Sequence, residues 1–179
     1  IVEDFRHRPL ADAGPFTFVS ADALTMKVRE GGRVVNAVAL IAVGVNADGH
    51  REVLGLRIAT SETGPAWNEF FADLTARGLT GVRLVTSDAH QGLVEAIAAN
   101  LPGATWQRCR THYAANLMSV TPKSMWPAVK AMLHSVYDQP TASAVNAQFD
   151  RLIEYTEDRL PEVAEHLGDA REDLLAFTA

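Results

Sequence analysis

The sequence has a single cysteine, no internal repeat and no long hydrophobic run. One cysteine excludes an internal disulfide and a cysteine-rich zinc cluster, and such sparing use of cysteine fits a cytoplasmic protein best. The longest apolar run, residues 34–45, is interrupted by Asn36 and Gly44 and is too short to cross a bilayer. We see no signal peptide, but the chain begins at Ile1 rather than Met, so we expect a piece of a longer protein.

The net charge of −6 argues against a broad nucleic-acid-binding surface. This charge is unevenly distributed, because residues 121–179 hold five basic and ten acidic side chains, whereas residues 1–120 hold eleven and twelve. The acidic character therefore belongs to the C-terminal part of the chain. A catalytic centre in the first part could still approach phosphate groups, especially with a bound divalent cation.

The pattern of apolar residues predicts an α/β fold followed by helices alone. Five stretches rich in β-formers predict strands, and short glycine-containing turns join the first three. Elsewhere apolar residues recur at helical spacing, and beyond Pro122 only this spacing remains. The predicted strands are residues 16–29, 34–45, 51–60, 82–86 and 104–109, and the predicted helices are residues 65–77, 93–101, 109–120, 125–136, 141–153, 161–167 and 170–177.

This order predicts a mixed five-stranded sheet. Three antiparallel strands come first, and right-handed crossovers then add parallel strands, with helices on the faces of the sheet. A chain of 179 residues suits one such domain with a helical annex. We therefore expect an α/β part at residues 1–121 and a helical segment at residues 122–179.

Two aspartates stand out as candidate metal ligands. Asp88 follows the predicted fourth strand, where active sites of open α/β sheets tend to lie. Asp22 lies within the first strand, where a half-buried carboxylate is costly unless it is paired or bound to a metal. If these two strands are neighbours, the carboxylates can converge, and a hard cation such as Mg²⁺ would relieve their repulsion. The alternatives are a D-x-x-Q helix cap formed by Asp88 with Gln91, and an Asp22 that faces solvent on an edge strand.

Further polar residues lie near these points in the sequence. His90 could orient a ligand or a phosphate, although the local sequence favours a surface histidine in a first helical turn. Cys109 and His112 share one helical face, but a structural zinc would need two more ligands. Arg108 and Arg110 flank this pair and could contact phosphate, or they could simply be solvated.

Four stretches together resemble one family, the bacterial insertion-sequence transposases of the Mutator type. The acidic EDLLAF stretch, residues 172–177, also resembles a helical segment of that family, so the resemblance covers nearly the whole chain from Phe16. The four stretches are DALTMKVREGGRVVN (22–36), GVNADGHREVLGL (44–56), SETGPAWNEFFADLTARGLTGVRLVTSDAHQGL (61–93) and PGATWQRCRTHYAANL (102–117).

The resemblance implies a ribonuclease H-like fold with a catalytic triad of two aspartates and a glutamate. Asp22 and Asp88 match the first two members, and Cys109 and His112 match the family's C-x-x-H motif. It further implies two Mg²⁺ or Mn²⁺ ions, DNA as the substrate at the element ends and the target, and a homo-oligomeric full-length enzyme. The reaction is DNA strand cleavage followed by strand transfer, in the bacterial cytoplasm and without a membrane.

One part of the family pattern is missing. The third carboxylate is a glutamate after an all-helical insertion, in a stretch resembling TNxxERxN, and this sequence has no such stretch. The acidic residues Glu154, Glu157, Glu162 and Glu165 are expected to face solvent on the insertion helices. The N-terminal DNA-binding region of the family is also missing, so we expect a catalytic-core fragment with two of three metal ligands, inactive alone.

Two other interpretations remain open. The first is another ribonuclease H-like enzyme, such as a structure-selective nuclease, which would share both aspartates. The second is a truncated module without catalytic activity that assembles with partners through its helices. Binding of Mn²⁺ that depends on Asp88 would separate the enzymes from the module.

Overall fold

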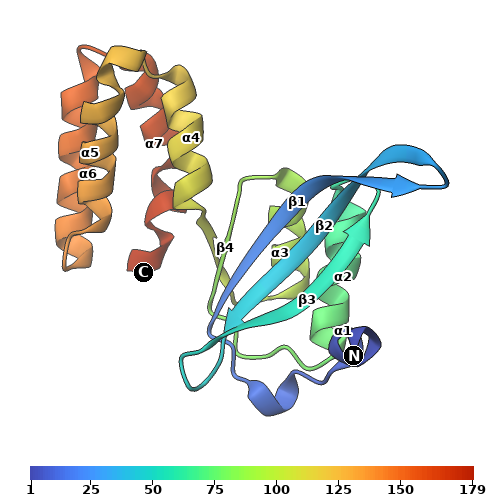
Figure 1. Cartoon of the computed structure of the whole chain (residues 1–179). Coiled ribbons are helices and arrows are strands. Elements are labelled where there is room, and N and C mark those ends of the chain that lie inside the picture. The colour runs from blue at the N-terminus through green and yellow to red at the C-terminus, as the bar shows by residue number, and fades with distance from the viewer. The chain divides into compact units, whose positions relative to one another are not determined.

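The computed structural model describes all residues, 1–179 (Figure 1). The chain forms two compact units, residues 1–106 and residues 107–179, which are described separately. The boundary expected after residue 121 stays a prediction. No helix combines the length and the apolar character needed to span a membrane.

A five-stranded mixed sheet in the order β3-β2-β1-β4-β5 organises the first unit. β1 pairs antiparallel with β2 and parallel with β4, and β2 pairs antiparallel with β3. The predicted α/β class, a mixed five-stranded sheet with three antiparallel strands before a parallel crossover, is confirmed. The strands are β1 (Phe18–Glu30), β2 (Arg33–Val45), β3 (Arg51–Ala59), β4 (Leu84–Ser87) and β5 (Thr105–Arg108).

The turn between β1 and β2 depends on two glycines. Gly31 and Gly32 have φ angles of 56° and 80°, and Glu30 pairs with Arg33 on either side of them. A two-residue turn with both φ angles positive matches the right-handed twist of the strands, and glycine adopts it without strain. The hairpin predicted here is confirmed.

Two helices, α2 (Gly64–Ala76) and α3 (Gln91–Asn100), cover one face of this sheet (Figure 1). The aromatic stripe of α2, formed by Trp67, Phe70 and Phe71, is buried in the core that α2 and α3 share with the sheet. The strand β1 alternates, with Val19 and Ala21 buried and their neighbours exposed. In this part of β1 one face of the strand is therefore buried and the other, which includes Phe18, is exposed. The N-terminal helix α1 (Val2–His7) and the short helix η1 (Ala11–Ala13) were not predicted.

The helices α2 and α3 approach each other through glycines. A Cβ atom added to Gly92 would lie 2.7 Å from both the Cα and the N of Gly64, closer than real Cβ atoms come to backbone. Both glycines lie at the start of their helices, immediately after the loops that lead out of β3 and β4. This contact therefore sets how close those two loops can lie.

The second unit is a helical bundle. Its core is formed by apolar residues of four helices, with Tyr113, Leu133, Phe149 and Leu167 fully buried. The two helices predicted after Pro161 form one, because the buried stripe continues through Ala170 to Leu174 without a break. The elements are α4 (Arg110–Val120), η2 (Lys123–Met125), α5 (Trp126–Tyr137), α6 (Ala142–Glu157), α7 (Pro161–Leu175) and η3 (Ala176–Thr178).

We expect Gly92→Ala to lower the free energy of unfolding by about 1–3 kcal/mol, because the new methyl group would force α2 and α3 apart. Gly168→Ala is the matched control, since it also lies in a helix and its Cβ would meet nothing within 4 Å. That substitution should stabilise by about 0.5–1 kcal/mol through the lower flexibility of alanine. Urea denaturation followed by circular dichroism measures both, and a Gly92→Ala protein as stable as the parent would refute the close contact.

Candidate active site

The pairing of β1 with β4 brings Asp22, within β1, to the same level as Asp88, which follows the end of β4. The parallel register joins Phe18 to Leu84 and ends at the pair Ser20 and Thr86. Asp22 and Asp88 each follow this last pair by two residues. Since neighbouring strands lie about 5 Å apart, both aspartates leave the paired region at the same level. The adjacency that the two-aspartate interpretation requires is therefore present.

Asp22 is exposed, so of the two alternatives left open by the sequence it is the solvent-facing side chain that the structure shows. Its Oδ1 accepts a hydrogen bond of 2.9 Å from the amide of Ala23. On one side Asp22 pairs with Ile41 of β2, but on the other side the pairing with β4 has already ended. The cost of burying a carboxylate consequently does not apply. The edge strand of that alternative is wrong, because β1 is the central strand of the sheet.

The helix cap that the sequence suggests for Asp88 is made by His90 instead. Helix α3 begins at Gln91, and the Nδ1 of His90 accepts a hydrogen bond of 3.3 Å from the amide of Leu93. Asp88 lies two residues before His90, and its Oδ1 accepts a hydrogen bond of 3.3 Å from the amide of His90. The D-x-x-Q capping box is therefore wrong, because the helix starts two residues later than it requires. Only one oxygen of Asp88 accepts a protein hydrogen bond, which leaves the carboxylate able to bind a further group.

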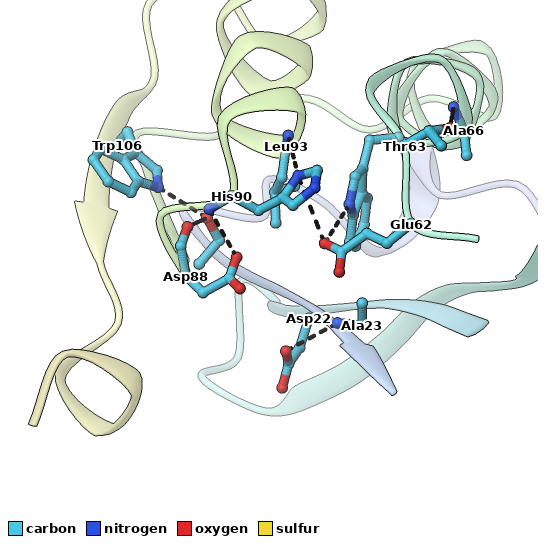
Figure 2. Close-up of polar contacts among 11 residues, drawn as sticks. Asp22, Ala23, Glu62, Thr63, Ala66, Asp88, His90, Leu93 and Trp106 are labelled. Atoms are coloured by element: carbon cyan, nitrogen blue, oxygen red, sulfur yellow. Dashed lines mark hydrogen bonds and ion pairs between the residues drawn. The ribbon is translucent and has the colours of Figure 1, made fainter. Parts of the chain in front are cut away.

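Glu62 is a third carboxylate in this region, and the sequence analysis did not single it out. It lies in the loop between β3 and α2, directly before Thr63, which caps α2 through its hydroxyl. Its Oε1 accepts a hydrogen bond of 3.0 Å from the indole of Trp67 and lies 3.8 Å from the Nδ1 of His90 (Figure 2). The sequence does offer a clue to Glu62, because it directly precedes the threonine cap of α2 and lies five residues before Trp67.

The Nδ1 of His90 has two competing contacts. When this nitrogen carries no proton, it accepts from the amide of Leu93; when it is protonated, it can instead form an ion pair with Glu62. The contact with Glu62 joins the loop before α2 to the loop before α3, which carries Asp88.

The end of β4 is held by a second set of contacts. Ser87 is buried, and its hydroxyl accepts a hydrogen bond of 2.9 Å from the indole of Trp106 (Figure 2). The same hydroxyl donates to the carbonyl oxygen of Asp88 at 2.7 Å. Asp88 is therefore held by two hydrogen bonds. Its carbonyl oxygen accepts from Ser87, and its carboxylate accepts from the amide of His90.

A family model described as "Transposase, Mutator family" matches residues 1–179. The chain belongs to the Mutator family of transposases. The chain is 65% identical over 178 residues to the transposase for insertion sequence IS1081 of Mycobacterium tuberculosis, covering 99% of this chain and 43% of that relative. It is 35% identical over 173 residues to the ISRM5 transposase of Rhizobium meliloti, covering 97% and 43%. The family predicted from the sequence is thus confirmed.

This Mutator-family chain spans 43% of the length of these curated relatives. Among solved structures, the Drosophila P element transposase strand transfer complex is a distant likeness. It is 12% identical with a TM-score of 0.38, and the match covers 65% of this chain and 32% of that one.

The remaining candidate residues of this Mutator-family chain lie at the end of β5 and in the first turn of α4. Cys109 is a free cysteine at the start of α4 and makes no capping hydrogen bond with its side chain, and His112 is exposed. The guanidinium of Arg108 lies over the ring of Tyr113 at 4.9 Å, and that of Arg110 lies over Tyr137 at 4.2 Å. The two arginines therefore stack on aromatic rings.

The carboxylates of Asp22 and Asp88 suit a hard cation. Carboxylate oxygens of one or two side chains are what Mg²⁺ takes from a protein, with water and phosphate completing its coordination. No three His, Cys, Asp or Glu side chains in the structure gather closely enough to hold a metal by themselves. A metal at Asp22 and Asp88 would therefore take its other ligands from water, substrate or another part of the full-length protein.

We expect His90→Ala to lower the free energy of unfolding by about 1 kcal/mol, because the amide of Leu93 loses its acceptor. His90→Asn should recover most of this loss, since asparagine is also a capping residue. His50→Ala, at an exposed turn position, serves as the control and should change little. Urea denaturation measures all three, and equal losses for His90→Ala and His90→Asn would contradict the capping role.

Proposed function

We propose that this chain is part of the catalytic core of an insertion-sequence transposase that cuts and joins DNA with divalent metal ions. The observation that carries the proposal is the parallel register of β1 and β4, which aligns Asp22 with Asp88. The family of the chain supports the reaction class. Its relatives are transposases for insertion sequences, so the proposed substrate is DNA at the element ends and at the target, in the bacterial cytoplasm.

In this proposal Asp22 and Asp88 hold Mg²⁺ or Mn²⁺, two ions in the complete site. When bound, such ions activate a water or a 3′-hydroxyl and stabilise the leaving oxygen of a phosphodiester. Asp22 offers an exposed carboxylate, and Asp88 offers a carboxylate on a main chain fixed by Ser87 and His90. Positioning and electrostatic stabilisation then account for most of the rate, as in phosphoryl transfer generally.

Glu62 and His90 are proposed as positioning residues for this site. Glu62 accepts from Trp67, a fully buried residue, and faces His90. The pair therefore connects the hydrophobic core to the loop that presents Asp88. The third catalytic carboxylate of the family, a glutamate, has no counterpart assigned in this chain, and homo-oligomerisation belongs to the proposal for the full-length enzyme.

A second candidate function is a module that assembles with partners and performs no chemistry. The separate helical core of residues 107–179 is the observation that favours it. Such a module would not need a metal at Asp22 and Asp88. Metal binding therefore discriminates between the two functions.

We expect calorimetric titration with Mn²⁺ to show binding that Asp88→Asn weakens about tenfold or more, because the charge of the ligands sets the affinity of such sites. Asp48→Asn is the matched control, since Asp48 is an exposed carboxylate in the turn between β2 and β3. It should bind Mn²⁺ like the parent. No binding, or equal binding in all three proteins, would favour the module.

We expect the 179-residue chain to join DNA ends little or not at all in a strand-transfer assay with supplied Mn²⁺. The reason is that the two aspartates form no cluster of three ligands with any other side chain. Robust joining of 3′-hydroxyl ends would overturn this expectation and would require another residue of this chain to complete the site.

A further inference from the structure

A groove between α4 and α5 lies in the helical unit and takes no part in the site described above. Its volume is about 790 Å³, and every residue that lines it falls between positions 110 and 137. Apolar and aromatic side chains form most of the wall, and three basic side chains stand among them. The residues that line it include Arg110, Met118, Trp126, Lys130, His134 and Tyr137.

The charge of the helical unit is divided between the two halves of its sequence. Residues 107–137 contain four Lys or Arg and no Asp or Glu, whereas residues 138–179 contain three Arg and ten Asp or Glu. The groove is built entirely from the first, acid-free half. An anionic ligand would consequently meet no carboxylate in its wall.

The two strongest cations of the groove stack on rings and are not paired with acids. Neither Arg110 nor Lys130 forms an ion pair in the structure. The Arg110 guanidinium lies 4.2 Å from the ring centroid of Tyr137 and 4.5 Å from that of Phe177. The Lys130 ammonium lies 5.5 Å from the ring centroid of Trp126. Stacking orients both charges but leaves them uncompensated, so a phosphate can bind them.

Tyr137 adds a polar group that the fold does not satisfy. Its hydroxyl is buried and has no hydrogen-bond partner. Burial raises the pKa of Tyr137 to about 12, against the opposing effect of Arg110. The hydroxyl therefore keeps its proton at neutral pH. A buried hydroxyl without a hydrogen-bond partner costs free energy. A ligand that accepted a hydrogen bond from this hydroxyl, after a small movement of the groove wall, would remove that cost.

We propose that this groove binds a single-stranded segment of DNA, with an unstacked base against Trp126 or Tyr137 and the adjoining phosphates at Arg110 and Lys130. Aromatic rings combined with a positive groove are the elements by which proteins hold single strands. Duplex DNA keeps the faces of its bases inside the stack and cannot offer them to this groove. The inference takes DNA as ligand from the proposed function, but it needs neither the metal nor the aspartates.

The test is fluorescence anisotropy of a short labelled oligothymidylate with the 179-residue chain, in EDTA and at about 50 mM salt. We expect a Kd in the micromolar range and a rise of about threefold or more for Lys130→Gln, with a salt dependence that is less steep by about one phosphate contact. Lys123→Gln is the matched control, because Lys123 is an exposed lysine of the same acid-free stretch that does not line the groove. It should bind like the parent.

A second readout follows the base itself. Stacking on Trp126 should quench tryptophan fluorescence as the oligonucleotide binds, and Trp126→Phe should remove this component, since Trp67 and Trp106 lie outside the groove. Circular dichroism establishes that Trp126→Phe remains folded after the loss of its hydrogen bond to Thr121.

Four outcomes would overturn the proposal. They are no binding by the parent, equal losses for Lys123→Gln and Lys130→Gln, equal affinity for a duplex of the same length, and sedimentation showing a self-association that Lys130→Gln abolishes. The last would assign the groove to the acidic helices of a second copy. Asp88→Asn should bind the oligonucleotide normally, so failure of the metal site and failure of the groove give different results.

Discussion

The parallel pairing of β1 with β4 is the contact on which the proposed site depends. It covers only three residues of each strand, from Phe18 and Leu84 to Ser20 and Thr86. Because side chains alternate along a strand, a shift of one residue in this register would turn one aspartate to the opposite face. Short pairing by itself specifies register weakly, so the flanking contacts matter. Ser87 is held by Trp106, and the antiparallel pairing of β1 with β2 runs along the whole of both strands.

The close approach of Gly64 and Gly92 provides the second constraint. With no side chains between them, the starts of α2 and α3 lie close enough for Glu62 to reach His90 at 3.8 Å. A wider separation would leave Glu62 with Trp67 alone. The geometry of the loop that carries Asp88 therefore depends on residues that have no chemistry of their own, as is common for sites supported by a rigid scaffold.

The sequence predicts those features that follow from local pattern. The five strands, the Gly31–Gly32 turn and the stripe of Trp67, Phe70 and Phe71 are all set by nearby residues, and the structure bears them out. The adjacency of β1 and β4 was only a condition of the two-aspartate interpretation, because nearby residues do not determine which strands pair. The cap of α3 could not be derived, because aspartate and histidine two residues apart can both cap a helix and the choice depends on where the helix packs.

Other features depend on contacts that are distant in the sequence. Asp22 is exposed because it lies, like Phe18 and Ser20, on the face of β1 that the shared core with α2 and α3 does not cover, and no pattern within β1 shows which face is covered. Glu62 is positioned by Trp67, which lies in α2, and by His90, which caps α3. The continuity of α7 through Gly168 reflects a buried stripe that outweighs the weak helix preference of glycine.

Net charge is a poor guide to nucleic-acid binding in this protein, because electrostatic effects act over about 8–10 Å at physiological salt. The residues that line the groove include basic side chains and no acidic ones, although the whole chain carries −6. The acidic helices α6 and α7 belong to the same helical core, so their field partly cancels that of Arg110 and Lys130. Charge attraction alone would then be too weak to hold DNA, and the contribution of stacking becomes decisive. A ligand that offers only phosphates lacks that contribution, whereas an unstacked single strand supplies both.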